Sequence, residues 1–322
     1  MSQTAAHIVQ VKGLPRRQAD QLRQRAVRLE RGVYLDGDAD PGSSAGSGGL
    51  VNRVRAGLAV APAGSVVTGA TTFTLAGAPL PDGFAEEAAQ RVHLLMPPTT
   101  RQGPRRPWIV PHTRSPHCAA LLLKSAGLLT TPITHSWVDA VQRLGRDTAW
   151  RPWSKEPPGL RGRFDRDAKR VFLEAVQLAD ALVRRQSPWC ALEELADCAA
   201  AARGTGSKLV RTAFEQVRAR TDSFMETWLR LVLWDAGFPD PTVNHDVWVG
   251  RQHYFIDLAW PERMVGLEYQ GRHHFDRPDQ SYGDSRRRGN LQKAGWTIVE
   301  AVYADLLDPA DLMARLAPTS NW

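Results

Sequence analysis

The stretch Tyr254-Phe-Ile-Asp-Leu-Ala-Trp-Pro-Glu-Arg-Met-Val-Gly-Leu-Glu-Tyr-Gln-Gly-Arg-His-His274 decides the fold of the C-terminal part of the chain. Two apolar runs flank a polar break, residues 261–264, that contains proline and charged side chains. This pattern predicts a β-hairpin. A turn centred on the break would place Asp257 directly opposite Glu268.

The two strands of this hairpin should each have one apolar and one polar side, because side chains alternate between faces. We expect the apolar face to carry Ile256, Leu258, Leu267 and Tyr269, with Leu258 opposite Leu267 and Ile256 opposite Tyr269. The polar face would carry Asp257, Glu268 and Gln270.

Asp257 and Glu268 carry like charges at directly opposed positions, where Cβ atoms lie about 4.5–5.5 Å apart and repulsion is destabilising. A shared divalent cation such as Mg²⁺ would cancel this repulsion, because carboxylate oxygens suit hard cations. The alternative is an exposed strand whose charges stay solvated. The residues alone leave both interpretations open.

Several motifs follow one another closely in this region, namely Ile256-Asp-Leu, then Glu268-Tyr-Gln-Gly eleven residues after Asp257, then His274, Asp284-x-x-Arg287 and Gly295-Trp296. Together they resemble the C-terminal domain of proteins related to very-short-patch repair endonucleases, within the restriction-endonuclease-like PD-(D/E)XK fold. The resemblance covers about residues 222–306. It implies an α/β (α+β) domain, a mixed sheet flanked by helices, that cleaves DNA with Mg²⁺ or Mn²⁺.

The resemblance also assigns roles to individual residues. The catalytic residues would be Asp257, Glu268, Gln270 and His274, the first two also binding the metal, and Arg287 and Arg286 would bind phosphate or DNA. Gln270 departs from the pattern, because such nucleases usually carry lysine there and this subfamily often aspartate. Glutamine can orient water but is neither a cation nor a base, so this departure puts catalysis in doubt.

Two further acids are accessory candidates, Glu226 and Asp284. Glu226 follows Ser223 with the spacing of a helix capping box, and Arg230 four residues later offers an ion pair. By the resemblance, Glu226 would instead approach the polar face of the hairpin. Asp284 could likewise take Arg287 into a salt bridge and away from phosphate.

The 322-residue chain has a net charge of +7, which favours polyanion partners such as DNA. Residues 221–322 hold 10 Lys/Arg and 15 Asp/Glu, a net charge of −5, and the remainder holds 31 and 19, a net charge of +12. The upstream part could therefore grip nucleic acid on which the C-terminal part acts. An arginine-rich composition that reflects a GC-rich genome explains the excess equally well.

The sequence shows no apolar run of membrane-spanning length and no secretion signal at its N-terminus. Three cysteines without Cys-x-x-Cys spacing indicate neither a disulfide framework nor a zinc site. We therefore expect a cytosolic protein that has no membrane partner. A protein partner is not indicated by any residue pattern.

The N-terminal part is predicted to contain a basic helix from Pro15 to about Leu29 and a strand at residues 31–35, which together resemble the winged-helix segment of AbiEi-type antitoxins. Further strands are expected at residues 66–75, 92–96 and 108–110, and a helix at 133–141. The expected domains are an AbiEi-like region at 1–146, a linker at 147–167, a helical connector at 168–221 and the nuclease-like domain at 222–322.

These features favour a metal-dependent DNA endonuclease. The alternative is a DNA-binding regulator of antitoxin type whose nuclease-like domain is inactive, which Gln270 and the partial winged helix favour. A protein-binding antitoxin partner is a third hypothesis that rests on the resemblance alone.

Overall fold

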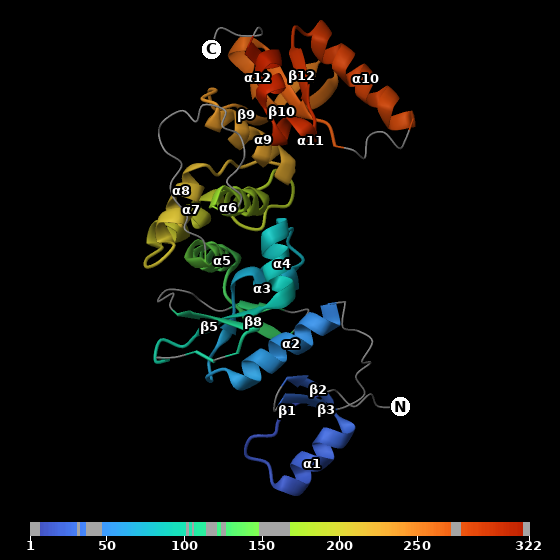
Figure 1. The fold of residues 1–322 in the computed structure, drawn as a ribbon. Helices are drawn as coiled ribbons and strands as arrows, with labels where there is room; N and C mark the ends of the chain where they lie inside the picture. Colours follow the sequence, from blue (N-terminus) through green and yellow to red (C-terminus); the bar gives the residue numbers. More distant parts are fainter. Residues whose placement is uncertain are drawn as a thin grey trace. The chain divides into compact units, whose positions relative to one another are not determined.

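The structure is a computed structural model and describes residues 7–30, 33–36, 47–100, 103–104, 106–113, 121–123, 127–147, 168–271 and 278–317. The chain folds into two compact units, residues 1–141 and 142–322 (Figure 1). Both units mix helices with sheets, so the predicted α/β class is confirmed. Among the described residues, no helix has the length and apolar character needed to cross a membrane.

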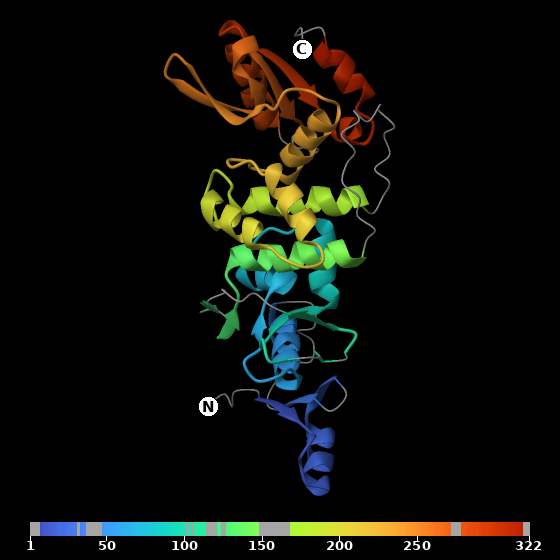
Figure 2. The ribbon, with the colours of Figure 1, turned by 90° about the vertical axis from the view of Figure 1, so that its left-hand side faces the viewer.

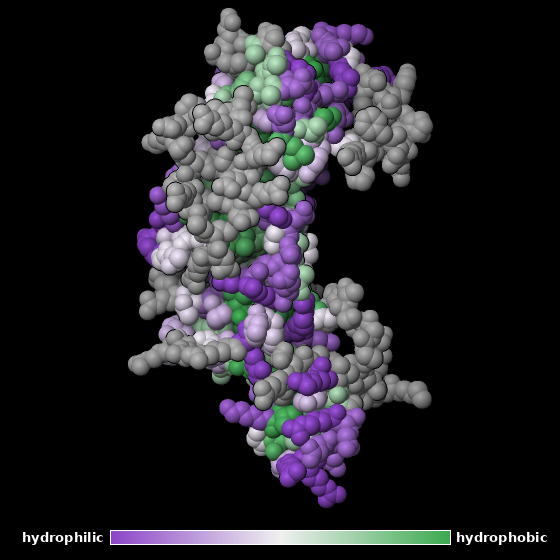
Figure 3. Space-filling view, in the orientation of Figure 1, coloured by the Kyte–Doolittle hydropathy of each residue, from purple (hydrophilic) through white to green (hydrophobic). Residues whose placement is uncertain are grey.

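The first unit opens with a three-stranded antiparallel sheet in the order β1-β3-β2. Its elements are β1 (His7–Gln10), α1 (Arg16–Arg25), β2 (Val27–Glu30) and β3 (Val33–Asp36). Helix α1 begins after Pro15, as predicted, but it ends at Arg25 instead of continuing to Leu29. The predicted helical pattern is wrong there because residues 27–30 pair with β3. Figure 3 shows hydrophilic side chains over most of the visible surface of α1.

A five-stranded mixed sheet in the order β6-β5-β4-β8-β7 completes the first unit. Its elements are α2 (Ser47–Val60), β4 (Val66–Val67), α3 (Gly69–Ala76), α4 (Asp82–Gln90), β5 (Val92–Met96), β6 (Ile109–Thr113), β7 (Leu121–Leu123), β8 (Leu128–Thr130) and α5 (Ile133–Asp147). The expected strand at 66–75 is wrong beyond Val67, because Gly69 to Phe73 are buried in helix α3. Burial thus overrides the β-propensity of its threonines.

Helix α5 runs across the division between the two units, and three helices follow it in the second unit, α6 (Ala168–Leu182), α7 (Leu192–Ala201) and α8 (Ser207–Glu215). Their bounds agree with the apolar periodicity of this region. The expected linker lies, apart from Asp147, outside the described residues. Helix α9 (Phe224–Asp235) follows and packs along α6, so the helical segment and the C-terminal sheet belong to one compact unit.

The C-terminal sheet has four strands in the order β12-β11-β10-β9. Its strands and the helices around them are β9 (Thr242–Val249), β10 (Gln252–Trp260), β11 (Val265–Tyr269), α10 (Pro278–Lys293), β12 (Thr297–Ala301), α11 (Tyr303–Leu307) and α12 (Ala310–Leu316). The predicted hairpin is confirmed, with a 3-10 turn at Pro261–Arg263 and Leu258 paired with Leu267. Strand β12 adds in parallel to β11.

The two faces of this sheet carry separate apolar cores. One face packs against α9, α11 and α12 through a core that includes Leu229, Leu233, Leu258, Leu267, Leu306 and Leu312. The other packs against α10 through a core that includes Ile256, Ala259, Leu291 and Trp296. Gly266 lies where a Cβ would come within 2.7 Å of Ile256 and 2.8 Å of Ile298, so only glycine lets this second core close.

Candidate functional site

The hairpin does not keep a single apolar face along its whole length. Leu258 packs into the core under α9, whereas Ile256 packs into the core under α10, so the expectation that both share a face is wrong. The neighbouring strand β9 changes face in the same way. Val243 packs into the core under α9, and Val247 packs into the core under α10. Between them Asn244 has a left-handed backbone with a φ of 44°. This local twist reverses the alternation.

Asp257 lies at this reversal, where the pairing of β10 and β11 ends at Leu258 and Leu267. One of its carboxylate oxygens, Oδ2, accepts the backbone N–H of Tyr269 at 2.9 Å. A side chain thus takes the place of a backbone carbonyl at the point where the two strands separate. This contact fixes the Asp257 carboxylate beside the end of β11.

Glu268 projects from β11 toward α10 and is only 5% exposed. Its Oε2 accepts Arg287 Nη1 at 2.7 Å, and Arg287 Nη2 donates to the carbonyl oxygen of Phe255. The other carboxylate oxygen, Oε1, is buried and has no hydrogen-bond partner among the described residues. Burying a carboxylate oxygen without a hydrogen-bond partner costs free energy, so Glu268 Oε1 is a candidate metal ligand.

Glu226 comes from the first turn of α9 and is buried. The backbone N–H of Glu226 donates to Ser223 Oγ at 3.2 Å, so the predicted serine cap forms. Its carboxylate, however, accepts the Asp222 backbone N–H at 3.0 Å and Asn244 Nδ2 at 2.8 Å. The alternative ion pair with Arg230 is wrong, because Arg230 bonds to an aspartate on α6.

The carboxyl groups at the site influence one another electrostatically. Burial raises the pKa of Glu226 to about 7, and the negative charge of Asp257 adds to the rise. Burial also raises the pKa of Glu268; the Arg287 guanidinium opposes this, and Asp257 again adds to it. Asp257 is therefore the shared neighbour of both glutamates. Carboxylates with raised pKa values in one place are typical of functional sites.

These residues fit a cation held by few ligands. Within the described part of the chain, no group of three or more His, Cys, Asp or Glu side chains gathers closely enough to bind a metal by itself. Mg²⁺, however, usually binds through one or two carboxylates and fills its other positions with water and substrate phosphate. The buried Oε1 of Glu268, close to Asp257, offers such a partial set.

Gln270 follows Glu268 by two residues, and its side chain points to β12. Its Nε2 donates to Glu300 Oε1 at 3.1 Å. Glu300 lies beside Glu268 in the parallel pair of strands and forms an ion pair with Arg288. Adjacent arginines of α10 thus neutralise adjacent glutamates of the sheet, while Arg286 is exposed.

Two of the predicted site residues are not described. His274 lies outside the described residues, and the side chain of Asp284 does as well, although its backbone belongs to α10. The expected competition of Asp284 for Arg287 therefore stays a prediction. The observed partner of Arg287 is Glu268.

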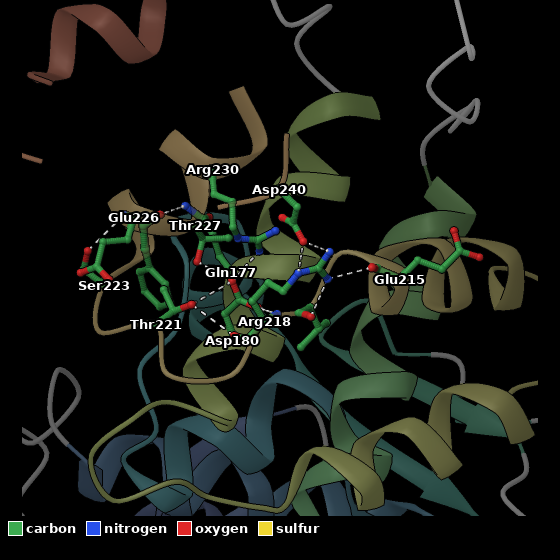
Figure 4. A network of polar contacts seen from close by, with 12 residues as sticks. Gln177, Asp180, Glu215, Arg218, Thr221, Ser223, Glu226, Thr227, Arg230 and Asp240 are labelled. Atoms are coloured by element: carbon green, nitrogen blue, oxygen red, sulfur yellow. Dashed lines mark hydrogen bonds and ion pairs between the residues drawn. The ribbon is translucent and has the colours of Figure 1, made fainter. Parts of the chain in front are cut away.

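A buried polar network anchors α9, and with it Glu226, to α6 (Figure 4). Asp180 and Arg230 are each 1% exposed or less and form an ion pair of 2.9 Å. Asp180 also accepts hydrogen bonds from the Thr227 hydroxyl at 2.8 Å and the Arg218 backbone N–H at 2.8 Å. Burial raises the pKa of Asp180, which the neighbouring Arg230 opposes.

The sequence prediction missed three residues that shape the site. They are Asn244, Arg288 and Glu300. The sequence itself indicates Glu300, because it is the single charged residue in the apolar strand Thr297-Ile-Val-Glu-Ala301. Asn244 left none, since its left-handed backbone depends on the tertiary structure.

Comparison with known proteins shows similarity to mycobacterial relatives. The chain is 33% identical over 146 residues to uncharacterized protein Rv2248 of Mycobacterium tuberculosis strain H37Rv, and equally to uncharacterized protein MT2308 of strain CDC 1551. The match covers 44% of this chain and 53% of each relative, so it spans about half the length of the relatives. No protein-family model matches the chain.

Proposed function

We propose that this chain is a Mg²⁺- or Mn²⁺-dependent endonuclease that hydrolyses phosphodiester bonds in DNA. The observation that carries the proposal is the buried and unpartnered Oε1 of Glu268, with Asp257 close by and Arg287 at the other carboxylate oxygen. The order of motifs along the hairpin and α10 adds support through its resemblance to repair endonucleases.

Asp257 and Glu268 would hold the metal in this proposal. When bound, Mg²⁺ activates water and stabilises the charge on the leaving oxygen. The raised pKa of Glu226 lets its carboxyl stay partly protonated near neutral pH, so it could donate a hydrogen bond to a phosphate oxygen. His274 is the proposed proton carrier, because a histidine side chain titrates near neutral pH.

Arg287 would bind the phosphate next to the cleaved bond. A guanidinium can donate to two phosphate oxygens at once. Because Arg287 already donates to Glu268, a DNA phosphate would be the second anion that it contacts. Arg287 could thus supply the positive charge that Gln270 lacks. Gln270, held by Glu300, would position water or a phosphate oxygen through its amide.

Cleavage of supercoiled plasmid tests the proposal, with purified protein in Mg²⁺, in Mn²⁺ and in chelator. We expect nicking that needs the metal and is at least about 100-fold slower in Asp257→Asn and in Glu268→Gln, because loss of a direct ligand should exceed the effect of an outer partner. Glu262→Gln is the matched control, since Glu262 is exposed at the turn of the same hairpin. Equal cleavage by wild type and both site variants would contradict the assignment.

A second candidate is a DNA-binding regulator whose nuclease-like domain does not cleave. The amide of Gln270 bonds to Glu300 and supplies no base, and the N-terminal unit combines arginine-rich α1 with a small antiparallel sheet, as winged helices do. Salt-sensitive DNA binding without cleavage in either metal, unchanged by Asp257→Asn, would favour this second function.

A further inference from the structure

Three aromatic rings and one guanidinium follow one another in a column beside the hairpin of β9 and β10. The ring centroids of Trp248 and His253 lie 4.4 Å apart with an angle of 12° between the planes. The ring centroids of His253 and Phe255 lie 4.5 Å apart with the planes tilted by 60°, and the Arg185 guanidinium lies 3.8 Å from the centroid of Phe255. Figure 2 shows this hairpin extending from the sheet.

A hydrogen bond and ion pairs hold the inner members of this column in place. His253 Nε2 lies 2.9 Å from Asp246 Oδ1, and Arg220 Nη2 donates to Asp246 Oδ2 at 2.6 Å. Arg185 forms an ion pair with Asp222. Because these groups are already ordered, a ligand that stacks on the column would lose little affinity to their immobilisation.

Trp248 forms the outer end of the column and is 65% exposed. A single exposed apolar side chain is ordinary on a protein surface. Here the tryptophan is also held flat against His253, and among the described residues its ring contacts are with His253 alone. One face of the indole is therefore supported, and the other is open to a flat ligand.

The inner rings of the column, His253 and Phe255, lie on β10, the strand that also carries Asp257. The carbonyl oxygen of Phe255 accepts Arg287 Nη2, and Asp257 follows two residues later on β10. His253 precedes Asp257 by four residues, which is about 13 Å of extended strand.

We propose that the open face of Trp248 binds an unpaired nucleobase of single-stranded DNA through stacking. The inference rests on the proposed action on DNA and adds the kind of DNA that is bound. Bases inside a duplex have both faces covered by their neighbours, whereas an unpaired base can stack on a protein ring. Arg251, exposed near the hairpin tip, adds positive charge suited to the strand's phosphates.

Fluorescence anisotropy of labelled oligothymidylate in chelator, where no cleavage occurs, tests this binding. Trp248→Ala should weaken binding about 5- to 150-fold, which corresponds to about 1–3 kcal/mol for one stacked base. Trp248→Phe should retain most of the affinity because it keeps a ring. Leu307→Ala, which changes another exposed apolar residue of this unit, is the control and should bind as wild type does.

An abasic strand of equal length separates stacking from charge. The Trp248→Ala variant should bind the abasic strand with the same affinity as wild type, because that strand has no base that could stack on the indole. Equal binding of oligothymidylate by wild type and Trp248→Ala would overturn the inference, as would an equal loss on the abasic strand. A shift of oligomeric state in Trp248→Ala, with DNA affinity unchanged, would also overturn it and assign the tryptophan to a protein contact.

The proposed nuclease can fail separately from this inference. If the protein binds single strands through stacking but does not cleave DNA in Mg²⁺ or Mn²⁺, the nuclease proposal is contradicted and the Trp248 site is supported. If cleavage needs the metal but Trp248→Ala does not change the affinity for single-stranded DNA, the nuclease proposal is supported and the stacking site is contradicted.

Discussion

Arg287 donates Nη1 to Glu268 Oε2 at 2.7 Å and so places a cation from α10 against the central carboxylate of the sheet. Glu268 is buried, while the Arg287 side chain is 29% exposed. An uncompensated buried carboxylate is expensive. Arg287 therefore stabilises the domain as well as facing the position proposed for phosphate.

Arg287→Ala should lower the free energy of unfolding by about 1–3 kcal/mol, less than for a fully buried pair because water reaches the guanidinium. Adding Glu268→Gln should recover part of that loss, since a neutral amide needs no counter-charge. Urea denaturation of the two single variants and the double variant measures the coupling. Strictly additive losses would mean that the two side chains do not stabilise each other.

The left-handed backbone of Asn244 gives a second prediction. Asn244 Nδ2 bonds to Glu226 and to the carbonyl oxygen of Arg220, and its φ is 44°. Asn244→Ala should destabilise by about 2 kcal/mol, because it loses both bonds and keeps an unfavourable backbone. Asn244→Gly should lose less, since glycine accepts this φ. Thermal melting compares them; a greater loss in the glycine variant would contradict the role of the backbone.

The buried pair of Asp180 and Arg230 gives a third prediction. Asp180→Ala should cost about 3–5 kcal/mol, because it leaves the Arg230 guanidinium buried without its carboxylate. Replacing both, as Asp180→Leu with Arg230→Met, should restore most of that stability. Chemical denaturation would show whether the double variant recovers; a double variant less stable than Asp180→Ala would contradict this explanation.

The pKa of Glu226 gives a pH dependence. Its folded pKa of about 7 lies above the ordinary value of 4.5, so the folded protein binds the extra proton more tightly. Glu226 therefore makes wild type lose stability as pH rises from 4.5 through 7, on the order of 3 kcal/mol in total. The Glu226→Gln variant has no titratable group at this position, so its stability relative to wild type should increase as pH rises across this window. Thermal melting of both proteins at pH 5 and pH 8 checks this prediction. A stability difference between them that is the same at both pH values would contradict the raised pKa.

The hairpin was predictable because its signal is local. A proline-containing break between two apolar runs defined the turn, and the turn defined which residues pair, down to Leu258 with Leu267. The position of Glu226 near Asp257 was one of two expectations from the resemblance and the cap spacing. Both uses of Ser223-x-x-Glu226 coexist, because the serine caps the helix while the glutamate reaches Asn244.

Other features depend on contacts between distant residues and could not be predicted. The face change at Ile256 follows from the backbone of Asn244 on a neighbouring strand. Residues 69–76 have strand-forming threonines but fold as a helix whose first five residues are buried, which no local pattern indicates. The ion pair between Arg287 and Glu268 joins residues nineteen positions apart in the chain, and no local pattern indicates it.

A divalent cation held by Asp257 and Glu268 is the central requirement of the proposed activity. Calorimetric titration of Mn²⁺ into wild type, Asp257→Asn, Glu268→Gln and Glu262→Gln tests it without relying on cleavage. We predict one site in wild type and in Glu262→Gln, at least about tenfold weaker in each of the other two variants. Equal Mn²⁺ affinity in all four proteins, or no binding to wild type, would contradict the metal site.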